Sequence, residues 1–299
     1  MKILLLGKNG QVGWELQRAL QPLGQVVALG RAGEGSLVGN LGDLPRLRRT
    51  IYDLKPNIVV NAAAYTAVDK AKSEPALARR INAEAPAMLA ECMKKLDGWL
   101  VHYSTDYVFD GSGQQPWRED QPTSPLNVYG QTKLEGEYAI QVSDCKHLIF
   151  RTSWVYAARG DNFAKTMLRL AAEREQLRII GDQIGAPTGA ELIADITAHC
   201  LHSSLKQPEL CGLYHLASAG EVSWHGYASF VIEQARLAGQ ELTVQEITAI
   251  TTADYPSPAL RPLNSRLDCS KLREIFGMHL PDWQGGVKRL LLETKGYSS

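Results

Sequence analysis

A tyrosine and a lysine four residues apart have the types and spacing needed to move a proton. Tyr129 and Lys133 lie in a stretch with helical apolar spacing, so we expect them on one face of a helix. A free phenol has a pKa of about 10 and is a poor acid or base at neutral pH. A nearby ammonium stabilises the phenolate and lowers that pKa. The pair therefore predicts proton transfer, although the same spacing is common on helix surfaces.

Near the N-terminus, a glycine-rich segment gives the pair a context. It follows an apolar run and opens a helical pattern, in the spacing G-x-x-G-x-x-G. Glycines here allow a tight turn and a close backbone approach to a pyrophosphate, and the helix N-terminus supplies free N–H groups. We therefore predict a nicotinamide dinucleotide site, contacted by Gly7, Gly10, Gln11, Val12 and Gly13. The positive ring of the oxidised cofactor would lower the pKa of the tyrosine further, and Lys133 can bind the nicotinamide ribose.

The end of the second apolar run bears on the choice of cofactor. Sites specific for NAD usually place an acidic residue there to bind the ribose 2′-hydroxyl. Gly30 and Arg31 stand there instead, and Arg31 can meet a 2′-phosphate. We expect NADPH to be used at least as well as NADH; the alternative is that Arg31 is a solvated loop residue.

A third segment, S-T-D-Y, ends the fourth apolar run. We expect Tyr103 beside the cofactor, and the Thr105 hydroxyl on the carbonyl oxygen of a substrate, which it would help to polarise. Together, the glycine loop, this segment and the Tyr129–Lys133 pair predict an oxidoreductase that delivers a hydride and a proton to a ketone.

Short apolar runs alternate with longer amphipathic stretches through the first half of the chain. Strands are predicted at residues 3–6, 26–29, 58–60, 100–103 and 148–150, and helices at 11–20, 44–54, 76–96 and 128–142. This alternation predicts an α/β fold with a doubly wound parallel sheet. We expect residues 1–150 to bind the cofactor. Residues 151–299 should mainly form a smaller substrate-binding region, with some segments returning to the sheet.

Bulk properties exclude several classes of protein. The 299 residues carry 32 basic and 32 acidic side chains, which gives no reason to expect a nucleic-acid or membrane surface. The five cysteines are scattered without a C-x-x-C pair, and no apolar stretch approaches the length of a membrane span. We expect a soluble cytoplasmic protein.

The motifs together resemble the extended short-chain dehydrogenase/reductase superfamily and, within it, the dTDP-4-dehydrorhamnose reductase family. The likeness covers essentially the whole chain. It rests on G-x-x-G-Q-V-G, V-N-A-A-A-Y-T-A-V-D, S-T-D-Y-V-F, N-V-Y-G, R-T-S-W-V-Y, D-Q-I-G-A-P-T and G-L-Y-H-L. The resemblance implies reduction of the C4 keto group of dTDP-4-dehydro-β-L-rhamnose to dTDP-L-rhamnose by NADPH or NADH. Tyr129 would be the proton donor.

Further roles follow from the resemblance, residue by residue. Asp106 and Trp154 would border the sugar together with Thr105. Asn40 and Leu41 would contact adenine, although Gly39-Asn40 replaces a frequent Gly-Asp. The residues expected to line the cofactor after the third strand are Ala63, Ala64 and Tyr65.

Other readings of the same residues stay open. Related dehydratases carry Asp-Glu where this chain has Asp106-Tyr107, which favours reduction over loss of water. An epimerase, another nucleotide-sugar reductase and a non-catalytic NADP-binding regulatory subunit remain alternatives. Arg261 is a candidate for the substrate diphosphate, or else a surface arginine in an ion pair.

The resemblance also suggests a metal. Bacterial members of the family form magnesium-linked homodimers through glutamates, and the matching positions here are Glu15, Glu191 and Glu293. Magnesium prefers oxygen ligands, so a glutamate cluster at an interface is chemically reasonable.

Overall fold

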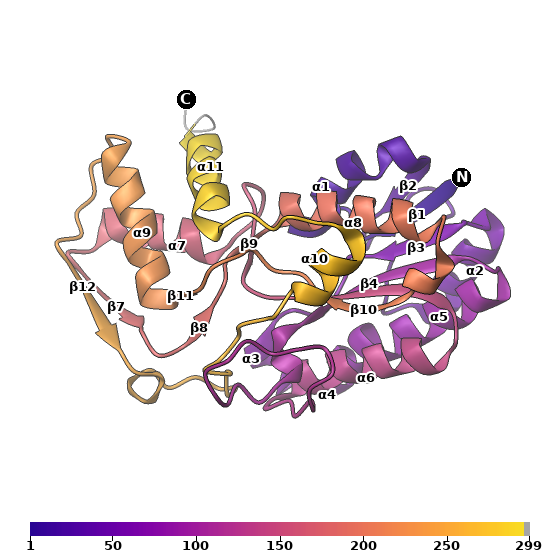
Figure 1. Ribbon diagram of the computed structural model, residues 1–299, viewed down its shortest axis with the longest axis horizontal. Helices are drawn as coiled ribbons and strands as arrows, with labels where there is room; N and C mark the ends of the chain where they lie inside the picture. Colours follow the sequence, from indigo (N-terminus) through magenta and orange to yellow (C-terminus); the bar gives the residue numbers. More distant parts are fainter. Residues whose placement is uncertain (296–299) are drawn as a thin grey trace.

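A six-stranded parallel sheet forms the centre of the computed structural model, which describes residues 1–295 (Figure 1). The strand order is β10-β5-β4-β3-β1-β2, and all neighbouring pairs are parallel. The strands are β1 (Lys2–Leu6), β2 (Gln25–Leu29), β3 (Ile58–Asn61), β4 (Trp99–Thr105), β5 (Lys146–Thr152) and β10 (Gly212–His215). This confirms the predicted fold class. β3 and β4 are buried along their whole length, as expected for parallel strands covered on both faces.

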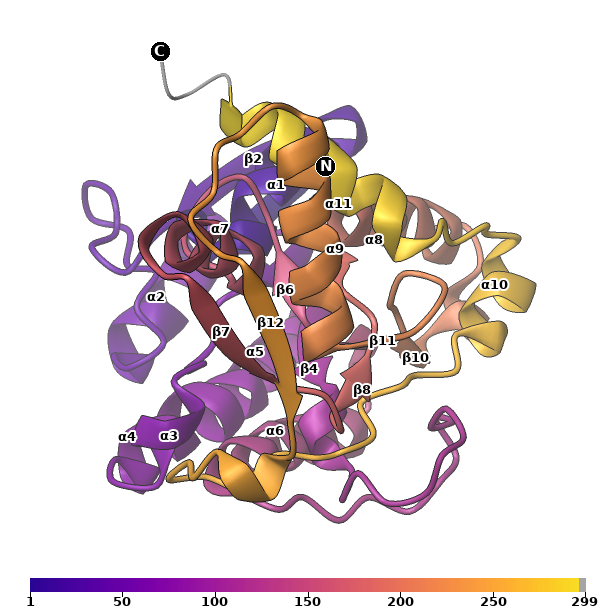
Figure 2. The same ribbon diagram turned by 90° about the vertical axis from the view of Figure 1, so that its left-hand side faces the viewer.

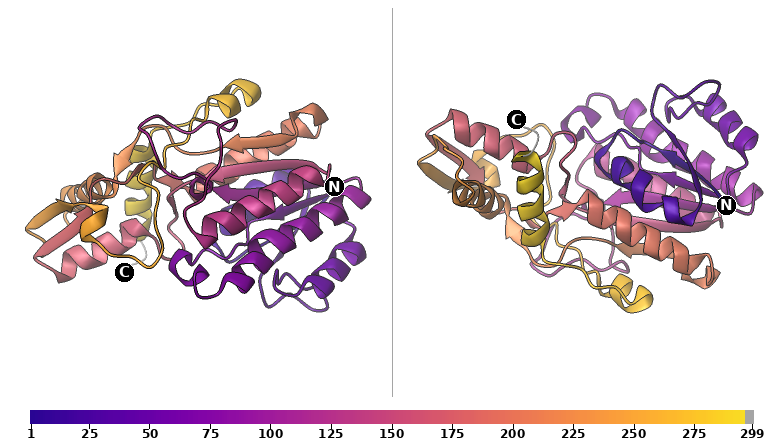
Figure 3. Two further views of the ribbon diagram at one scale, coloured as in Figure 1. Left: turned by 90° about the horizontal axis from the view of Figure 1, so that it is seen from below. Right: turned by 90° about the horizontal axis from the view of Figure 1, so that it is seen from above.

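Helices cover both faces of the sheet, and a separate apolar core lies between each face and its helices (Figures 1 and 3). One face carries α1 (Gln11–Ala19) and α8 (Ala190–Ser204), which pack on the cluster around Ile3 and Leu148. The other face carries α2 (Leu44–Leu54), α5 (Ala85–Lys95) and α6 (Val128–Val142). Because β10 and α8 come from the second half of the chain, both halves contribute to this layer arrangement.

The predicted long helix over residues 76–96 is confirmed as one continuous helical stretch over residues 75–95, but it contains a π-helical turn that was not predicted. The structure has α4 (Pro75–Arg79), a π-helical turn η2 (Arg80–Glu84) and then α5. Pro86 lies at the start of α5 and has no N–H to donate to the preceding turn, so the hydrogen-bond pattern changes there. A short helix α3 (Val68–Ala71), not predicted, precedes α4.

The remaining elements form a smaller lobe beyond the carboxyl ends of the strands (Figure 2). Its helices are α7 (Phe163–Glu173), α9 (Trp224–Leu237) and α11 (Trp283–Lys295), packed on a third apolar core. β7 (Gln176–Ile180) and β12 (Glu246–Ile250) form a parallel pair. Two-residue strands form the pairs β6 (Val155–Tyr156) with β9 (Thr188–Gly189), and β8 (Ile184–Gly185) with β11 (Val222–Ser223). Helix α10 (Ser270–Phe276) returns to the edge of the main sheet beside β10.

Single turns of 3₁₀ helix complete the described chain: η1 (Gln21–Leu23), η3 (Asp106–Val108), η4 (Pro208–Leu210) and η5 (Thr252–Asp254). All five cysteines are free thiols. Within residues 1–295, no helix is long and apolar enough to cross a bilayer.

Candidate active site

A cavity of about 620 Å³ lies at the carboxyl ends of the parallel strands, the usual ligand position in open α/β sheets. The glycine loop, Tyr129 and Lys133 all line it. Its full lining is Gly7, Asn9, Gly10, Gln11, Val12, Gly30, Arg31, Gly39, Asn40, Leu41, Ala62, Ala63, Ala64, Thr66, Ile81, Tyr103, Ser104, Tyr129, Lys133, Thr152, Val155 and Gly160.

Most of the predicted cofactor residues are in this lining, and two are not. Gly13 packs behind the loop: a Cβ there would lie 2.1 Å from the Gly7 carbonyl oxygen. Its role is thus the close approach of α1 to the loop, while Gly7 takes the left-handed φ of 90° that the turn requires. The Tyr65 side chain instead donates its hydroxyl hydrogen to Glu74 at 2.6 Å.

The lining includes nine residues that were not predicted: Asn9, Gly39, Ala62, Thr66, Ile81, Ser104, Thr152, Val155 and Gly160. Thr152 ends β5, directly opposite Thr105 in the pairing of β4 with β5. Residues at the ends of parallel strands meet at one edge of the sheet, so the strand predictions contained a usable signal for Thr152. For Gly160, which lies in a loop, no local pattern pointed to the cavity.

Tyr129 is placed by the close packing of α6 on η3. A Cβ at Gly130 would lie 2.1 Å from the Tyr107 carbonyl oxygen, so only glycine lets the helix start there. The Asn127 side chain caps α6 by accepting from the Gly130 N–H at 2.9 Å, and it donates to the Leu260 carbonyl oxygen at 2.7 Å. The phenol of Tyr129 meets the ring of Tyr107 edge to face at 5.6 Å.

The environment of Tyr129 holds it in its protonated form. Burial raises the pKa of Tyr129 to about 12; a hydrogen bond with Thr105 opposes this, and the charge of Asp106 adds to it. The lowering of this pKa expected from Lys133 is not found, because burial of the phenol has the largest effect on it and raises it. A protonated phenol is the form that a reduction needs.

Thr105 and Asp106 form a buried polar pair beside this phenol. The Thr105 hydroxyl donates to Asp106 Oδ1 at 3.0 Å and accepts from the Tyr107 N–H at 3.2 Å. Asp106 Oδ2 is buried without a hydrogen-bond partner. Burial raises the pKa of Asp106 to about 6, against hydrogen bonds with Ser265 and Thr105 that lower it.

Lys133 is almost completely buried, at 2% exposed. Its amine donates to the Tyr103 carbonyl oxygen at 2.5 Å and contacts His102 Nε2 at 3.3 Å. Burial lowers the pKa of Lys133 to about 8, against the opposing charge of Glu137. Within residues 1–295, no hydrogen bond joins Lys133 to Tyr129, so the two groups share the cavity without direct contact.

The π-helical turn contributes a residue that the sequence did not single out. Asn82 accepts from the Tyr65 N–H at 2.8 Å and donates to the Tyr65 carbonyl oxygen at 3.1 Å and to Thr132. It thereby ties the loop after β3 to α6. A Cβ at Gly136 would lie 2.1 Å from the Asn82 carbonyl oxygen, which explains a glycine inside α6.

Trp154 lies on the lobe side of the site. It adopts a left-handed φ of 48°, which strains a non-glycine residue and is frequent at functional positions. Its ring stacks on Trp224 with centroids 3.6 Å apart. Gly185 makes room for it, since a Cβ there would lie 2.7 Å from the indole.

Arg261 lies near the same end of the site but is engaged. Its guanidinium donates to Asp69 at 2.8 Å and to the Ala259 carbonyl oxygen at 3.2 Å. Its charge lowers the pKa of Tyr107, against the larger effect of burial. Arg261 therefore lies close to the Tyr107–Tyr129 contact, and its ion-pair partner, Asp69, belongs to α3.

The three glutamates expected to bind magnesium line one small cavity between α1, α8 and α11. Arg289 contacts two of them, at 3.5 Å from Glu191 and 3.0 Å from Glu293. Burial raises the pKa of Glu191, and the charges of Glu293 and Glu15 add to this against Arg289. Within the described residues, no group of three or more His, Cys, Asp or Glu side chains is arranged to hold a metal ion.

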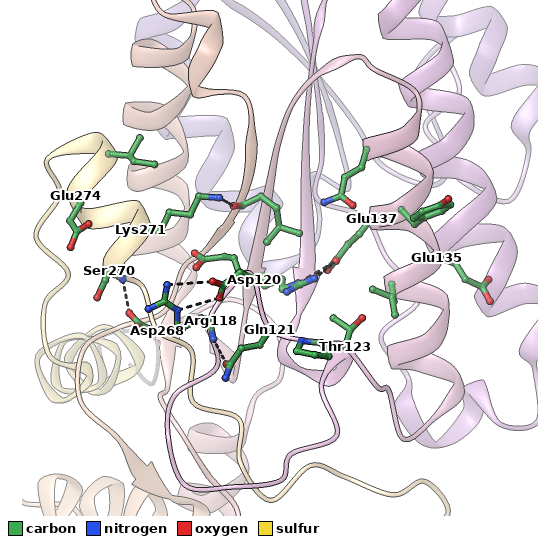
Figure 4. A pocket seen from close by; sticks show the side chains of 18 residues that line it. Arg118, Asp120, Gln121, Thr123, Glu135, Glu137, Asp268, Ser270, Lys271 and Glu274 are labelled. Atoms are coloured by element: carbon green, nitrogen blue, oxygen red, sulfur yellow. Dashed lines mark hydrogen bonds and ion pairs between the residues drawn. The ribbon is translucent and has the colours of Figure 1, made fainter.

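A larger cavity, of about 1060 Å³, lies elsewhere, over the outer edge of β10 (Figure 4). Several of its polar side chains hydrogen-bond to backbone groups of this edge strand, which has no neighbouring strand there. Glu119 accepts from the His215 N–H at 2.8 Å, and Lys271 donates to the Leu213 carbonyl oxygen at 2.8 Å. Arg118 is held by Asp120, and Glu137 by Arg151. These groups already have partners, whereas the cavity at Tyr129 keeps polar groups such as Ser104 Oγ unpaired.

Comparisons with known proteins agree along the whole chain. A family model described as the RmlD substrate binding domain matches residues 1–295. A dTDP-4-dehydrorhamnose reductase of Shigella flexneri and one of Escherichia coli K12 are each 54% identical over 293 residues, covering 98% of both chains. Among solved structures, a dTDP-4-dehydrorhamnose reductase from Bacillus anthracis in complex with NADP has a TM-score of 0.88. It is 31% identical and covers 98% of this chain and 99% of its own.

Proposed function

The chain belongs to the RmlD family of dTDP-4-dehydrorhamnose reductases, and from that premise we propose that it reduces the C4 keto group of dTDP-4-dehydro-β-L-rhamnose to dTDP-L-rhamnose. The observation that carries this proposal is the phenol of Tyr129, which lines the same cavity as the glycine loop. The phenol is protonated and hydrogen-bonded to Thr105.

NADPH or NADH supplies the hydride, which is transferred to C4 of the sugar. Tyr129 donates its proton to the oxygen of the same carbonyl group, so the developing alkoxide is neutralised as it forms. The Thr105 hydroxyl, which donates to Asp106 Oδ1 in the structure, would turn its single hydrogen to that oxygen and so polarise the ketone. Lys133 binds the nicotinamide ribose and, as an ammonium, favours loss of the phenol proton.

The fit of a dinucleotide rests on the cavity itself. The loop from Gly7 to Gly13 presents the N-terminus of α1, where free N–H groups and the helix dipole favour a pyrophosphate. Asn40, Leu41, Gly30 and Arg31 also line the cavity, and we assign the adenine half of the cofactor to them. Ala63, Ala64 and Tyr103 line the cavity too, and the small side chains of the two alanines leave room for the nicotinamide half.

For the sugar nucleotide, we assign Asp106 and Trp154 to the sugar, beside Thr105. The unpaired Oδ2 of Asp106 is suited to accept from a sugar hydroxyl. The strained Trp154, stacked on Trp224, provides a rigid apolar wall. Arg261 is our candidate for the diphosphate, which it would bind by exchanging its ion pair with Asp69.

The test is an assay of the purified chain with dTDP-4-dehydro-β-L-rhamnose, following the loss of NADPH absorbance and identifying the product. Stoichiometric formation of dTDP-L-rhamnose supports the proposal. An altered sugar without net NADPH oxidation would favour an epimerase. Cofactor binding without any turnover would favour a non-catalytic regulatory subunit.

We also propose that the protein is a homodimer in which magnesium joins Glu15, Glu191 and Glu293 across the interface. Three carboxylates around one small cavity fit a hard cation, but one chain alone does not provide a complete ligand set. The ion would compete with Arg289 for Glu191 and Glu293. Sedimentation with and without EDTA tests this: a dimer that dissociates on chelation supports it, and a dimer unaffected by EDTA contradicts it.

A further inference from the structure

Three buried polar side chains from β3, β4 and α6 form a hydrogen-bonded row that ends at Lys133. Asn61, His102 and Lys133 are 1%, 1% and 2% exposed. Asn61 Nδ2 lies 3.1 Å from His102 Nδ1, and His102 Nε2 lies 3.3 Å from Lys133 Nζ. Asn61 and His102 are direct neighbours in the pairing of β3 with β4, so the sheet fixes their separation.

The direction of the hydrogen bonds in this row follows from Asn61. Its Oδ1 accepts from the Ala63 N–H at 3.3 Å, so its amide nitrogen faces His102. An amide nitrogen can only donate, and His102 Nδ1 must therefore accept. Burial, with the charge of Lys133, lowers the pKa of His102, so the ring is neutral and carries its single proton on Nε2.

The Nε2–H of His102 then points at the amine of Lys133. An ammonium has three donors and no lone pair, whereas an unprotonated amine can accept this hydrogen bond. Lys133 can still donate to the Tyr103 carbonyl oxygen. We propose that Asn61 and His102 are positioning residues for Lys133, and that the direction of their hydrogen bonds favours the unprotonated form of its amine. Its consequence for turnover rests on the proposed role of Lys133 in the reduction.

Other features of the surroundings of Lys133 raise or lower the pKa of its amine. Burial lowers the pKa of Lys133, and Glu137, one turn along α6, raises it. Glu137 is itself ion-paired with Arg151 on β5 at 2.7 Å. On the η3 side, Asp106 acts on the phenol of Tyr129. The row of Asn61 and His102 is uncharged. By the proposal it lowers the pKa of Lys133, as burial does, whereas Glu137 raises that pKa.

This arrangement would set the alkaline limit of the reduction. Reduction consumes a proton and needs Lys133 as an ammonium near the phenol, so turnover should fall as the pH rises past the pKa of Lys133. Asn61→Asp should reverse the direction of the hydrogen bonds in this row, because aspartate has nearly the shape of asparagine but can only accept. A carboxylate accepts from His102 Nδ1–H, which moves the ring proton to Nδ1 and leaves Nε2 free to accept from the ammonium.

The first measurement is the pH profile of kcat with saturating NADPH and keto-sugar. We expect Asn61→Asp to move the alkaline limb upward by about one pH unit or more. His147→Gln, a change at a buried histidine on β5 bonded to the Cys145 carbonyl oxygen, should leave the limb in place. An alkaline limb that Asn61→Asp does not move would overturn the proposal.

The second measurement does not depend on turnover. Nitrogen chemical shifts of the histidine rings distinguish a protonated from an unprotonated ring nitrogen, and the loss of a signal in His102→Gln identifies His102. We expect Nε2 to be protonated and Nδ1 to accept in the wild type, with the reverse in Asn61→Asp. A wild-type ring protonated on Nδ1 would overturn the proposal even if the keto-sugar is reduced. Conversely, an inactive protein with the expected tautomer would count against the proposed function alone.

Discussion

The cofactor side of the site and its lobe side are built from different groups. On the cofactor side, glycines and strand ends bring backbone atoms close together: a Cβ at Gly13 would lie 2.1 Å from a carbonyl oxygen of the loop. On the lobe side, aromatic rings stack, with Trp154 on Trp224 and Phe163 beside Trp224 at 4.5 Å. Backbone contacts leave a trace in the sequence as glycine spacing, whereas a stack of rings from distant segments leaves none.

Tyr129→Phe should produce the largest effect, because it removes the proton donor that lies between the two sides. We expect kcat to fall by about 10²- to 10⁴-fold, the usual contribution of a general acid. The affinity for NADPH should stay close to that of the wild type, since the loop at Gly7 to Gly13 is untouched. Stopped-flow turnover together with calorimetric titration of NADPH measures both, and a near-normal kcat would refute the role of Tyr129.

A matched pair of glycine substitutions tests the comparison directly. Gly13→Ala places its Cβ against backbone of the loop, which has little freedom to move. Gly185→Ala meets the Trp154 indole at 2.7 Å, a side chain that can shift. We expect Gly13→Ala to lower both the melting temperature and the NADPH affinity, the latter by about tenfold or more, which is about 1.4 kcal/mol.

Gly185→Ala should instead raise KM for the keto-sugar, with an unchanged dissociation constant for NADPH. Titration of NADPH into both variants, combined with steady-state kinetics, separates the two results. If Gly185→Ala weakened NADPH binding as much as Gly13→Ala does, the division into a backbone-built and an aromatic side would be wrong.

How much the sequence could predict follows the same division. The strand at residues 58–60 and the loop at Gly7 were readable, because buried parallel strands are continuously apolar and pyrophosphate loops need glycine. The π-helical turn could not be predicted in the same way, although Pro86 inside the predicted helix indicated a change in the hydrogen-bond pattern. In the lobe, β7 and β12 went unpredicted because they pair with each other across many residues of chain. Gly185 had no visible role until Trp154 was placed beside it.

Asp106→Asn should increase stability at neutral pH. Burial raises the pKa of Asp106 from 3.8 to about 6, so between these values the folded protein holds a proton that the unfolded chain has lost. Stability therefore falls as the pH rises through this window, by at most about 3 kcal/mol at pH 7. Urea unfolding should show a gain for Asp106→Asn at pH 7 that disappears below about pH 4.

The matched control for this change lies in the lobe. Asp182 accepts from the Thr252 N–H at 2.9 Å and from its hydroxyl at 2.7 Å, so Asp182→Asn should destabilise the protein at pH 7, by about 1 kcal/mol. Opposite signs for the two substitutions would show that Asp106 beside Tyr129, and not Asp182 in the lobe, has a carboxylate oxygen without a hydrogen-bond partner. A loss of stability in both would contradict that reading.

Arg31 differs from the rest of the cofactor side, because it is a charged side chain among backbone contacts. Its substitution should have the smallest effect of those predicted here. It lines the cavity and has no ion pair within the described residues, whereas the neighbouring cation Lys8 is paired with Glu34 at 3.3 Å. An exposed guanidinium that meets a 2′-phosphate contributes about 1 kcal/mol. Arg31→Gln should therefore lower kcat/KM for NADPH by about five- to tenfold and leave that for NADH unchanged. Lys8→Gln should change the ratio less, because its charge is already engaged. A wild-type enzyme that strongly prefers NADH would contradict the assignment and return Arg31 to a solvated loop position.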